Sequence, residues 1–261
     1  YTDIDSQRAF QLAILKGMKD SIQPQHVMTP DAIALLIGYF AQKISESKQF
    51  VSIFDPVCGT SNLILKVIEQ IKKPYAAYGN EIDPTLLQLA AIQTNIQKIK
   101  IEYFHQDAMR PFLLDPVDLV VADLPIGYYP DDERASTFQL KASKGHSYAH
   151  HLLMEQSINY TKDGGYLIFL IPETLFDSDQ SDQLHTYLHQ HVHIIGVLQL
   201  PSTVFKTGQH RRSILILQKQ GENTTSVKQP LLVQLPSLND FSAMENILGK
   251  INRWFDEHLY T

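Results

Sequence analysis

Residues 50–71 read FVSIFDPVCGTSNLILKVIEQI, and this stretch decides the fold class. It starts as a short apolar strand that ends at Asp55, passes through a tight loop, and continues as a helical stretch over residues 62–71. The same unit follows again, with a strand expected over residues 75–78 and a helix over residues 85–99. Strands that alternate with helices in this way are typical of a parallel sheet with helices on both faces.

The rest of the chain extends this pattern in both directions. Residues 123–145 are polar and irregular, and functional residues often lie in a long insertion directly after a strand. Apolar spacing predicts further strands at 101–104, 118–122, 166–171, 194–200, 213–218 and 231–235, and further helices at 4–18, 31–44, 147–160, 180–190 and 241–259. The strands at 194–200 and 213–218 are expected to form an antiparallel edge.

The chain contains no linker rich in Gly and Ser, so its organisation is expected to be simple. We expect a helical N-terminal cap over residues 1–46. Residues 47–261 are then expected to form one α/β domain, with a mostly parallel, doubly wound sheet and an antiparallel edge strand.

Composition limits the classes of function. The 261 residues include 22 Lys and Arg against 28 Asp and Glu, a net charge of -6, and 44% are hydrophobic, which is typical of a globular protein. Nucleic-acid binding is built on phosphate neutralisation by Lys and Arg, so the acidic balance argues against a surface that grips nucleic acid by charge alone. Any nucleic-acid role therefore needs a local basic patch or a partner.

Three features bear on the compartment. The most apolar run, at residues 164–172, is far shorter than the ~20 residues of a membrane-spanning helix, so we expect no membrane association. The first ten residues carry neither a basic stretch nor an apolar core, which argues against a signal peptide. The single cysteine, Cys58, excludes an internal disulfide and is typical of the reducing cytoplasm, where we expect the protein to reside.

Four consecutive expected strands end next to an acidic residue. These acids are Asp55 in DPVCGT, Glu81 in GNEIDP, Asp107 in HQDA and Asp123 in DLPIGYYP. One such acid is often only a helix cap, but four of them along the edge where doubly wound sheets bind ligands indicate a common site. Gly59 lets the backbone approach a ligand, and a carboxylate after the second strand suits a ribose diol because it accepts two hydroxyl hydrogen bonds.

The absence of two phosphate-binding motifs further limits the class of ligand. Neither GxxxxGK nor GxGxxG occurs, which disfavours a phosphorylated nucleotide. A ring of carboxylates better suits a nucleoside with a cationic centre and an uncharged tail.

The four motifs, in this order, resemble the S-adenosylmethionine-dependent amino-methyltransferases of the Rossmann-like class I. The strongest likeness is to the adenine-N6 DNA methyltransferases, especially the modification subunits of type I restriction systems. It extends from Thr29-Pro30 to Lys219 and includes GGYLIFLIPETLF, LQLPSTVF and RRSILILQK. The resemblance implies the Rossmann-like methyltransferase fold, S-adenosylmethionine as cofactor, DNA as substrate and a partner protein that supplies target specificity.

The resemblance also assigns cofactor contacts. Thr29 and Asp55 would lie near the methionine end, Glu81 would hold the ribose hydroxyls, and Asp107 would bind the adenine amino group. Ser61 stands where the family often has a second Gly, which fits if that position needs no positive φ. The implied cofactor-binding residues are Thr29, Asp55, Cys58, Gly59, Thr60, Glu81, Asp107, Ala108 and Asp123. Thr29-Pro30-Asp31 is also readable as an ordinary helix start, since Thr caps helices and Pro suits their first turn.

The fourth motif would carry the chemistry. The lone pair of an adenine amine is delocalised into the ring, so acceptors must hold its N–H groups and localise that pair towards the methyl donor. The Asp123 carboxylate and the Leu124 carbonyl would be these acceptors, and Pro125 helps to aim the carbonyl because it restricts the preceding residue to extended geometry. Positioning and preorganised electrostatics would lower the barrier, without a covalent intermediate.

The same motif departs from the family pattern of Asp or Asn, Pro, Pro and an aromatic residue. Leu124 replaces the first Pro, and Ile126 replaces the aromatic residue that stacks on the extruded base. Such a stack contributes about 1–3 kcal/mol. Tyr128 is the expected substitute and Tyr129 the alternative, while packing of the loop by both tyrosines explains them equally well.

The remaining polar residues carry weaker signals. Candidate phosphate contacts are Arg134, Lys141, Lys144, Arg211 and Arg212, for which a solvated surface is the simpler interpretation. The histidines of HSYAHH (146–151) and HTYLHQHVH (185–193) have helical spacing but no HExxH pattern and no nearby cysteine, so we expect no metal site. Cys58 has no obvious partner base, which favours packing over a nucleophilic role.

The leading hypothesis is therefore an S-adenosylmethionine-dependent N-methyltransferase that resembles the adenine-specific DNA enzymes. One alternative is a cofactor-binding regulatory protein whose fourth motif has decayed, as Leu124 and Ile126 suggest. Another keeps the enzyme but changes the acceptor to RNA or to a protein glutamine, whose planar amide poses the same problem of a delocalised lone pair.

Overall fold

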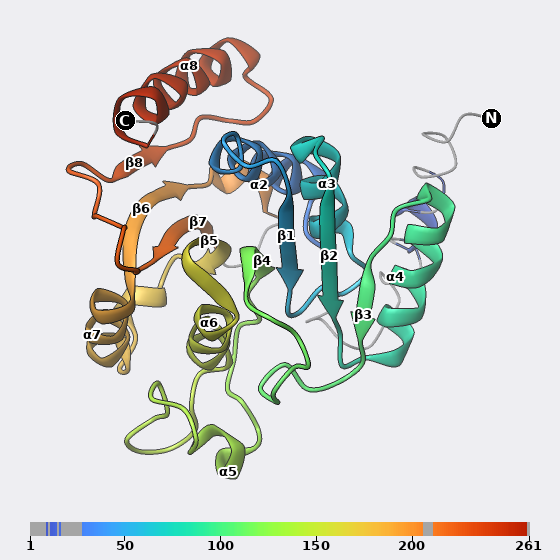
Figure 1. Cartoon of the computed structure of the whole chain (residues 1–261), viewed down its shortest axis with the longest axis vertical. Coiled ribbons are helices and arrows are strands. Elements are labelled where there is room, and N and C mark those ends of the chain that lie inside the picture. Colours follow the sequence, from blue (N-terminus) through green and yellow to red (C-terminus); the bar gives the residue numbers. More distant parts are fainter. Residues whose placement is uncertain (1–8, 10, 15, 17–27, 206–210, 260–261) are drawn as a thin grey trace. The chain divides into compact units, whose positions relative to one another are not determined.

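The stretch that decides the fold class forms strand β1 (Val51–Asp55), a loop and helix α3 (Asn62–Ile71), as the sequence predicts. The structure is a computed structural model, and it describes residues 9, 11–14, 16, 28–205 and 211–259. The chain, shown in Figure 1, divides into two compact units, Tyr1–Pro125 and Ile126–Thr261.

The sheet of the first unit has the strand order β3 (Glu102–Phe104), β2 (Tyr75–Asn80), β1 and β4 (Val117–Asp123). All three neighbouring pairs are parallel, with Phe54 opposite Tyr78 on one side and Val120 on the other. Strand β1 is therefore an interior strand, and a nearly continuous apolar sequence suits that position. Parallel pairing also brings the carboxyl ends of these strands to one edge of the sheet, where the four acids were expected.

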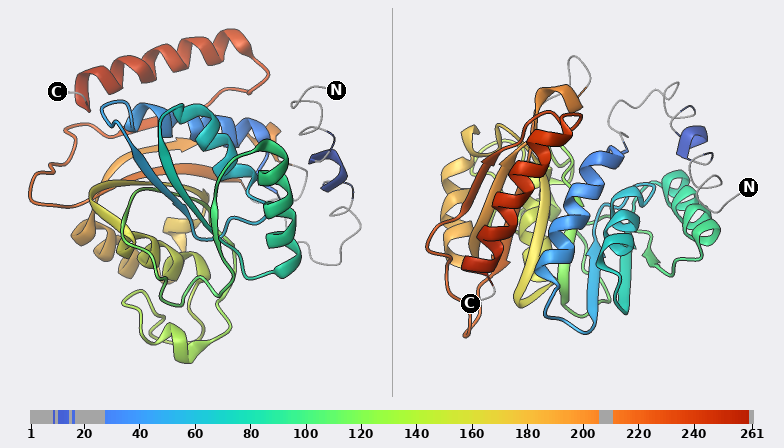
Figure 2. Two further views of the ribbon diagram at one scale, coloured as in Figure 1. Left: turned by 45° about the vertical axis from the view of Figure 1, so that its right-hand side comes forward. Right: turned by 90° about the horizontal axis from the view of Figure 1, so that it is seen from above.

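Helices of the first unit begin and end for local reasons. Helix α2 (Asp31–Ile44) packs against α3, and the two lie side by side in both views of Figure 2. Helix α4 (Pro84–Gln97) starts after Asp83, whose carboxylate accepts hydrogen bonds from the Thr85 and Leu86 N–H groups. It ends two residues earlier than expected because Lys98 adopts the left-handed conformation, with φ +55°.

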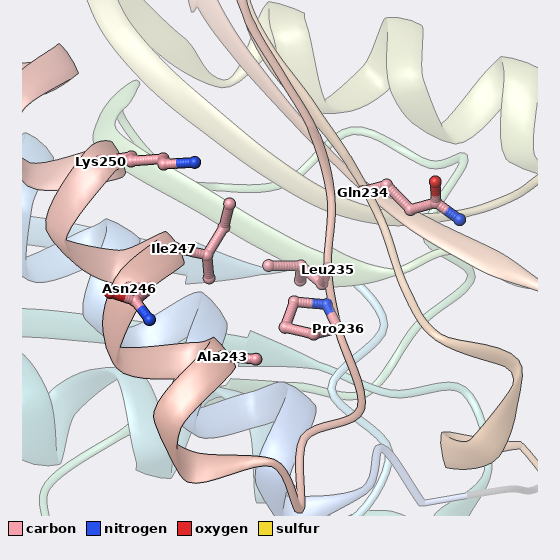
Figure 3. Close-up of a pocket in the computed structure, with 7 residues that line it drawn as sticks. All are labelled: Gln234, Leu235, Pro236, Ala243, Asn246, Ile247 and Lys250. Atoms are coloured by element: carbon pink, nitrogen blue, oxygen red, sulfur yellow. The ribbon is translucent and has the colours of Figure 1, made fainter.

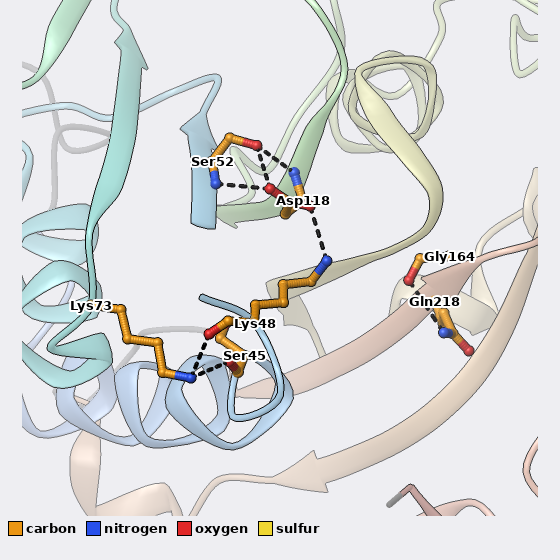
Figure 4. Close-up of polar contacts among 7 residues, drawn as sticks. All are labelled: Ser45, Lys48, Ser52, Lys73, Asp118, Gly164 and Gln218. Carbon is orange, nitrogen blue, oxygen red and sulfur yellow. Dashed lines mark hydrogen bonds and ion pairs between the residues drawn. The ribbon is translucent and has the colours of Figure 1, made fainter. Parts of the chain in front are cut away.

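The amino ends of β1 and β4 are joined by side chains. The Asp118 carboxylate accepts hydrogen bonds from the Ser52 N–H and hydroxyl at 2.9 and 2.7 Å and from Lys48 Nζ at 3.0 Å. Nearby, Lys73 Nζ donates to the carbonyls of Ser45, Glu46 and Lys48 just beyond the end of α2, and Figure 4 shows two of these bonds beside the Asp118 cluster. This cluster fixes the chain between α2 and β1.

The sheet of the second unit has the order β5 (Thr161–Pro172), β7 (Arg212–Lys219), β6 (Val192–Gln199) and β8 (Leu231–Gln234). Strand β7 is antiparallel to both β5 and β6, which confirms the expected antiparallel pairing of residues 194–200 with 213–218. The pair does not form the edge of the sheet as expected, because β8 adds a parallel strand beyond β6. A Gln218 Nε2 hydrogen bond to the Gly164 carbonyl, at 3.2 Å, further links β7 to β5 (Figure 4). The helices are α5 (Asp132–Ala135), α6 (Ala149–Asn159), α7 (Ser181–His191) and α8 (Phe241–His258), with short 3-10 turns at Leu175–Asp177 and Ser202–Val204.

The largest differences from the expected elements concern β5 and the segment 123–145. Strand β5 starts five residues before the expected position, because its polar TKD beginning carries no apolar alternation that a sequence pattern could register. The expected irregular segment 123–145 contains the short helix α5, capped by the Asp131 carboxylate. Of the expected helix at 4–18, only residues 9, 11–14 and 16 are described, and these are helical, while the rest lies outside the described residues. Within the described chain, no helix is both long enough and apolar enough to cross a bilayer.

Candidate functional site

Three of the four predicted acids stand at the ends of neighbouring strands in the first unit, and the fourth follows β3 at a short distance along the chain. Asp55 is the last residue of β1, Asp123 is the last residue of β4, and Glu81 directly follows β2. Asp107 lies three residues beyond the end of β3. The sequence motifs thus correspond to successive positions along the carboxyl edge of one sheet.

Asp55 lies at the centre of this group and is only 1% exposed. Burial raises the pKa of its carboxyl well above the ordinary value, against a hydrogen bond of 3.1 Å from the Val57 N–H, and the charges of Asp123 and Glu81 raise it further. The structure therefore places Asp55 close enough to both Asp123 and Glu81 for their charges to repel its own. A cation placed among them would relieve that repulsion.

Glu81 is held by two backbone N–H groups from different segments. Its Oε2 accepts a hydrogen bond from Gly59 at 2.9 Å, and its Oε1 accepts one from Asp83 at 2.8 Å. Each carboxylate oxygen has two lone pairs, so one on each oxygen remains for a ligand hydroxyl. This fixed orientation fits the ribose-binding role that the sequence implies.

The loop between β1 and α3 uses backbone conformations that favour glycine. Gly59 has φ +55°, and Ser61 has φ +68° although it carries a side chain. Position 61 therefore has a positive φ, so the condition under which Ser replaces Gly without strain is not met. Ser61 is fully buried, and its hydroxyl lies 2.8 Å from the Tyr103 hydroxyl on β3, a contact that holds the strained residue in place.

Thr29 and Asp123 are brought together from 94 positions apart. The Thr29 hydroxyl donates to Asp123 Oδ2 at 2.9 Å, and the Thr29 carbonyl accepts a hydrogen bond from the Asn62 side chain at 2.6 Å. Helix α2 does begin directly after Pro30, but no side chain caps it. The interpretation of Thr29 as a helix cap is therefore wrong, since its hydroxyl is directed to the fourth acid.

The other predicted residues of the first unit take ordinary loop positions. Asp107 accepts a hydrogen bond from the Met109 N–H at 2.9 Å, and Ala108 is buried beside it. Cys58 is buried and lies close to Gly79, and burial raises the pKa of its thiol well above the ordinary value, which agrees with a packing role. In the fourth motif Leu124 is fully buried. Pro125 is exposed.

The two candidate tyrosines of the second unit differ sharply. Tyr129 is 7% exposed, whereas Tyr128 is 59% exposed. Tyr128 stacks on Tyr148, with ring centroids 4.8 Å apart and an interplanar angle of 18°, and the Tyr148 hydroxyl donates to Asp179 at 3.0 Å. Tyr129 packs the loop, and Tyr128 is left as the aromatic residue that a planar ligand could reach.

The predicted basic contacts all lie in the second unit. Lys141, Lys144 and Arg211 are exposed, and Arg212 is partly exposed at the start of β7. The Arg134 guanidinium lies 5.6 Å from the centre of the Phe138 ring. Their exposure is compatible with phosphate contacts and equally with a solvated surface.

The described residues contain no group of three or more His, Cys, Asp or Glu side chains arranged to hold a metal ion. In the histidine-rich segment 146–151, His150 and His151 are buried in α6, and the His146 ring lies 2.9 Å from the Asp132 carboxylate. A hollow of about 510 Å³ lies in the second unit between α8 and the segment that follows β8 (Figure 3). None of its lining residues is a predicted site residue, and none is acidic: they are Gln234, Leu235, Pro236, Ala243, Asn246, Ile247 and Lys250.

Sequence reasoning missed the polar side chains that hold the predicted acids in place. Asn62 binds Thr29, and Asn80 binds the segments that precede Cys58 and Asp107. Asn80 lies inside the quoted motif GNEIDP, directly before Glu81, and Asn62 lies two positions after the end of DPVCGT. A sequence signal for both was available, because an amide side chain that is expected to be buried must form hydrogen bonds inside the protein.

Comparison with known proteins adds a family and a set of relatives. Residues 22–251 match the family described as N-6 DNA Methylase. The uncharacterized protein YtxK of Bacillus subtilis (strain 168) is 49% identical over 250 residues, which cover 95% of this chain and 76% of that protein. A crystal structure from Listeria monocytogenes, provisionally described as a class I S-adenosylmethionine-dependent methyltransferase, has a TM-score of 0.92 at 42% identity and covers 98% of this chain and 80% of its own.

A more distant likeness concerns the fold alone. The methyltransferase subunit of a type I restriction-modification system from Streptococcus thermophilus has a TM-score of 0.67 at 16% identity, over 87% of this chain and 53% of that one. The architecture is thus shared with proteins whose sequences have diverged widely.

Proposed function

The chain belongs to the N-6 DNA Methylase family and is an S-adenosylmethionine-dependent methyltransferase, and from this premise we propose that it methylates the exocyclic amine of adenine in DNA. The observation that carries the proposal is the convergence of buried Asp55 with Glu81 and Asp123 at one sheet edge. A reducing cytoplasm is the compartment that the single cysteine favours.

The donor set of the first unit fits the cofactor. S-adenosylmethionine supplies, when bound, a methyl group on a positively charged sulfur. Asp55 is buried among like charges, so a cation at this edge would stabilise its ionised form. We assign the ribose hydroxyls to Glu81, whose two oxygens are already oriented by the Gly59 and Asp83 N–H groups. The backbone of Cys58, Gly59 and Thr60 and the Asp107-Ala108 turn complete the proposed contacts.

The fourth motif is proposed to receive the adenine amine. The Thr29 hydroxyl donates to one oxygen of Asp123 and thereby fixes the plane of that carboxylate. Asp123 and the Leu124 carbonyl would then accept the two N–H groups of the amine and localise its lone pair. A single preorganised hydrogen-bonding group in an active site, such as an oxyanion-hole donor, contributes about 100- to 1,000-fold in rate, and we expect a contribution of this order here.

Base stacking and target choice are assigned to the second unit. Tyr128 is the proposed stacking residue because it is exposed and its ring is steadied by Tyr148. Arg134, Lys141, Lys144, Arg211 and Arg212 are proposed phosphate contacts. A net charge of -6 makes a specificity partner the natural source of further DNA affinity.

Transfer of a tritiated methyl group to DNA tests the proposal. The protein is incubated with labelled S-adenosylmethionine and unmethylated DNA, and the nucleosides are then separated. We expect label in N6-methyladenine, and a 100- to 1,000-fold lower rate for Asp123→Ala, because an acceptor of the amine is lost. The matched control is Asp182→Ala, since that acid is exposed on α7.

Other outcomes point to the alternatives. In parallel incubations that offer RNA or protein in place of DNA, label in RNA or in a protein glutamine would show that this molecule is the methyl acceptor. Cofactor binding without any transfer would instead favour the regulatory protein that Leu124 and Ile126 suggest.

A further inference from the structure

We propose that Asn80 is a positioning residue that ties the loop after β1 to the segment after β3 and so preforms the cofactor site. The inference rests on the proposed function in one respect, namely that the cofactor binds at this sheet edge. Asn80 itself is not expected to touch the cofactor, and its effect would be exerted through Asp55, Cys58 and Asp107.

Asn80 is the last residue of β2, the strand between β1 and β3, and is 1% exposed. Its side-chain Nδ2 donates to the Pro56 carbonyl at 2.9 Å and to the Gln106 carbonyl at 3.1 Å. Its backbone carbonyl accepts a hydrogen bond from the Cys58 N–H at 2.8 Å. One residue thus makes three hydrogen bonds to segments on both sides of its own strand.

The position of these contacts explains why they matter. The β1–β2 and β2–β3 ladders end at Asp55 opposite Gly79 and at Asn80 opposite Phe104, so the segments beyond have no further strand pairing. Pro56 directly follows Asp55, and Gln106 directly precedes Asp107. Beyond the ends of the strand pairing, the Asn80 amide therefore supplies the hydrogen bonds that hold the two segments containing the proposed cofactor residues.

The donor chemistry is specific to an amide. Both N–H groups of the Asn80 side chain are directed to carbonyls, whereas no described residue hydrogen-bonds its Oδ1, which is buried. The side chain thus acts through its two donors. Leu has the same number of side-chain heavy atoms in a similar branched arrangement but no donor, so Asn80→Leu would fill the site and remove both hydrogen bonds.

Preorganisation decides the expected effect. If the two loops are held in the binding conformation before the cofactor arrives, the cofactor loses no binding free energy to ordering them. Without the Asn80 donors, the cofactor must order both loops as it binds. We therefore expect weaker binding by at least tenfold, together with faster amide exchange of residues 57–61 and 107–109 in the unliganded protein.

The test measures S-adenosylmethionine affinity by isothermal titration for the wild type, Asn80→Leu and Ser52→Ala, with hydrogen–deuterium exchange on each. Ser52→Ala is the matched control, because it removes the two hydrogen bonds between the Ser52 hydroxyl and Asp118 at the opposite end of β1, one to the carboxylate and one from the backbone N–H, and leaves the carboxyl edge untouched. A purely structural role of Asn80 would lower the melting temperature of Asn80→Leu and leave its cofactor affinity and the exchange of both loops at the wild-type level. A positioning role weakens binding and loosens both loops in Asn80→Leu alone.

The outcomes separate the inference from the function on which it rests. A wild type that binds the cofactor, with an Asn80→Leu variant that binds equally well, overturns the inference and leaves the function intact. A wild type that does not bind removes the function and, with it, the inference. If Asn80→Leu does not fold, exchange in the wild type decides: cofactor must protect 57–61 and 107–109 together, and protection of only one segment contradicts the tie.

Discussion

At the scale of single residues, two buried polar side chains, those of Ser61 and His151, lower the stability of the folded state. Ser61 adopts a left-handed conformation that costs a non-glycine residue roughly 1 kcal/mol, and the Tyr103 hydroxyl offsets part of that cost. His151 is a buried residue of another kind. It is fully buried in α6, and no described residue hydrogen-bonds either of its ring nitrogens.

The pKa of His151 predicts how stability depends on pH. Burial, together with His150, lowers this pKa from 6.5 to about 3. As the pH falls from 6.5 to about 3, the unfolded chain takes up a proton that the folded chain cannot bind, so stability decreases by up to ~1.4 kcal/mol per pH unit. Urea unfolding at pH 7.5 and pH 5 should show that the wild type loses about 2 kcal/mol more than His151→Leu does.

The control for this prediction is His185→Leu, because His185 is exposed on α7. It should keep the pH dependence of the wild type. Equal pH dependence in the wild type and in His151→Leu would contradict the prediction.

At the scale of elements, the sequence predicted best where one face of a helix or strand is apolar throughout. Helices α2 and α3 have the expected bounds because their apolar stripes are continuous and end at polar residues. The end of α4 was misjudged by two residues, since Lys98 stops the helix through its backbone conformation. Such terminations depend on hydrogen bonds that the residue type alone does not reveal.

The end of α2 yields a prediction for the element scale. Lys73 Nζ donates to three carbonyls at or beyond that helix end, and its positive charge also complements the helix dipole. Lys73→Met should therefore lower the unfolding free energy by about 1–2 kcal/mol in a denaturant titration. The neighbouring Lys72→Met serves as the control because Lys72 is exposed. If the unfolding free energy falls by the same amount in both variants, the three hydrogen bonds from Lys73 to backbone carbonyls do not stabilise the fold.

At the scale of the whole molecule, the motifs predicted which acids lie at the sheet edge but not what holds them there. Asp55, Glu81 and Asp123 follow from strand ends and parallel pairing, which local sequence patterns reveal. The Thr29 bond to Asp123 and the Asn80 tie join segments that are far apart in the chain, so no local pattern announces them. The division of the chain into a cap over residues 1–46 and a domain over residues 47–261 stays a prediction.

The central claim is that carboxylates from successive strand ends converge on one cationic nucleoside, and cofactor titration tests it most directly. Isothermal titration of the wild type with S-adenosylmethionine should give one site per chain. Asp55→Ala and Glu81→Ala should each weaken that binding by tenfold or more, because each removes a charged partner worth at least about 1.4 kcal/mol. Ser52→Ala, at the opposite end of β1, should bind as the wild type does. No binding by the wild type, or binding that survives both acid substitutions unchanged, would contradict the claim.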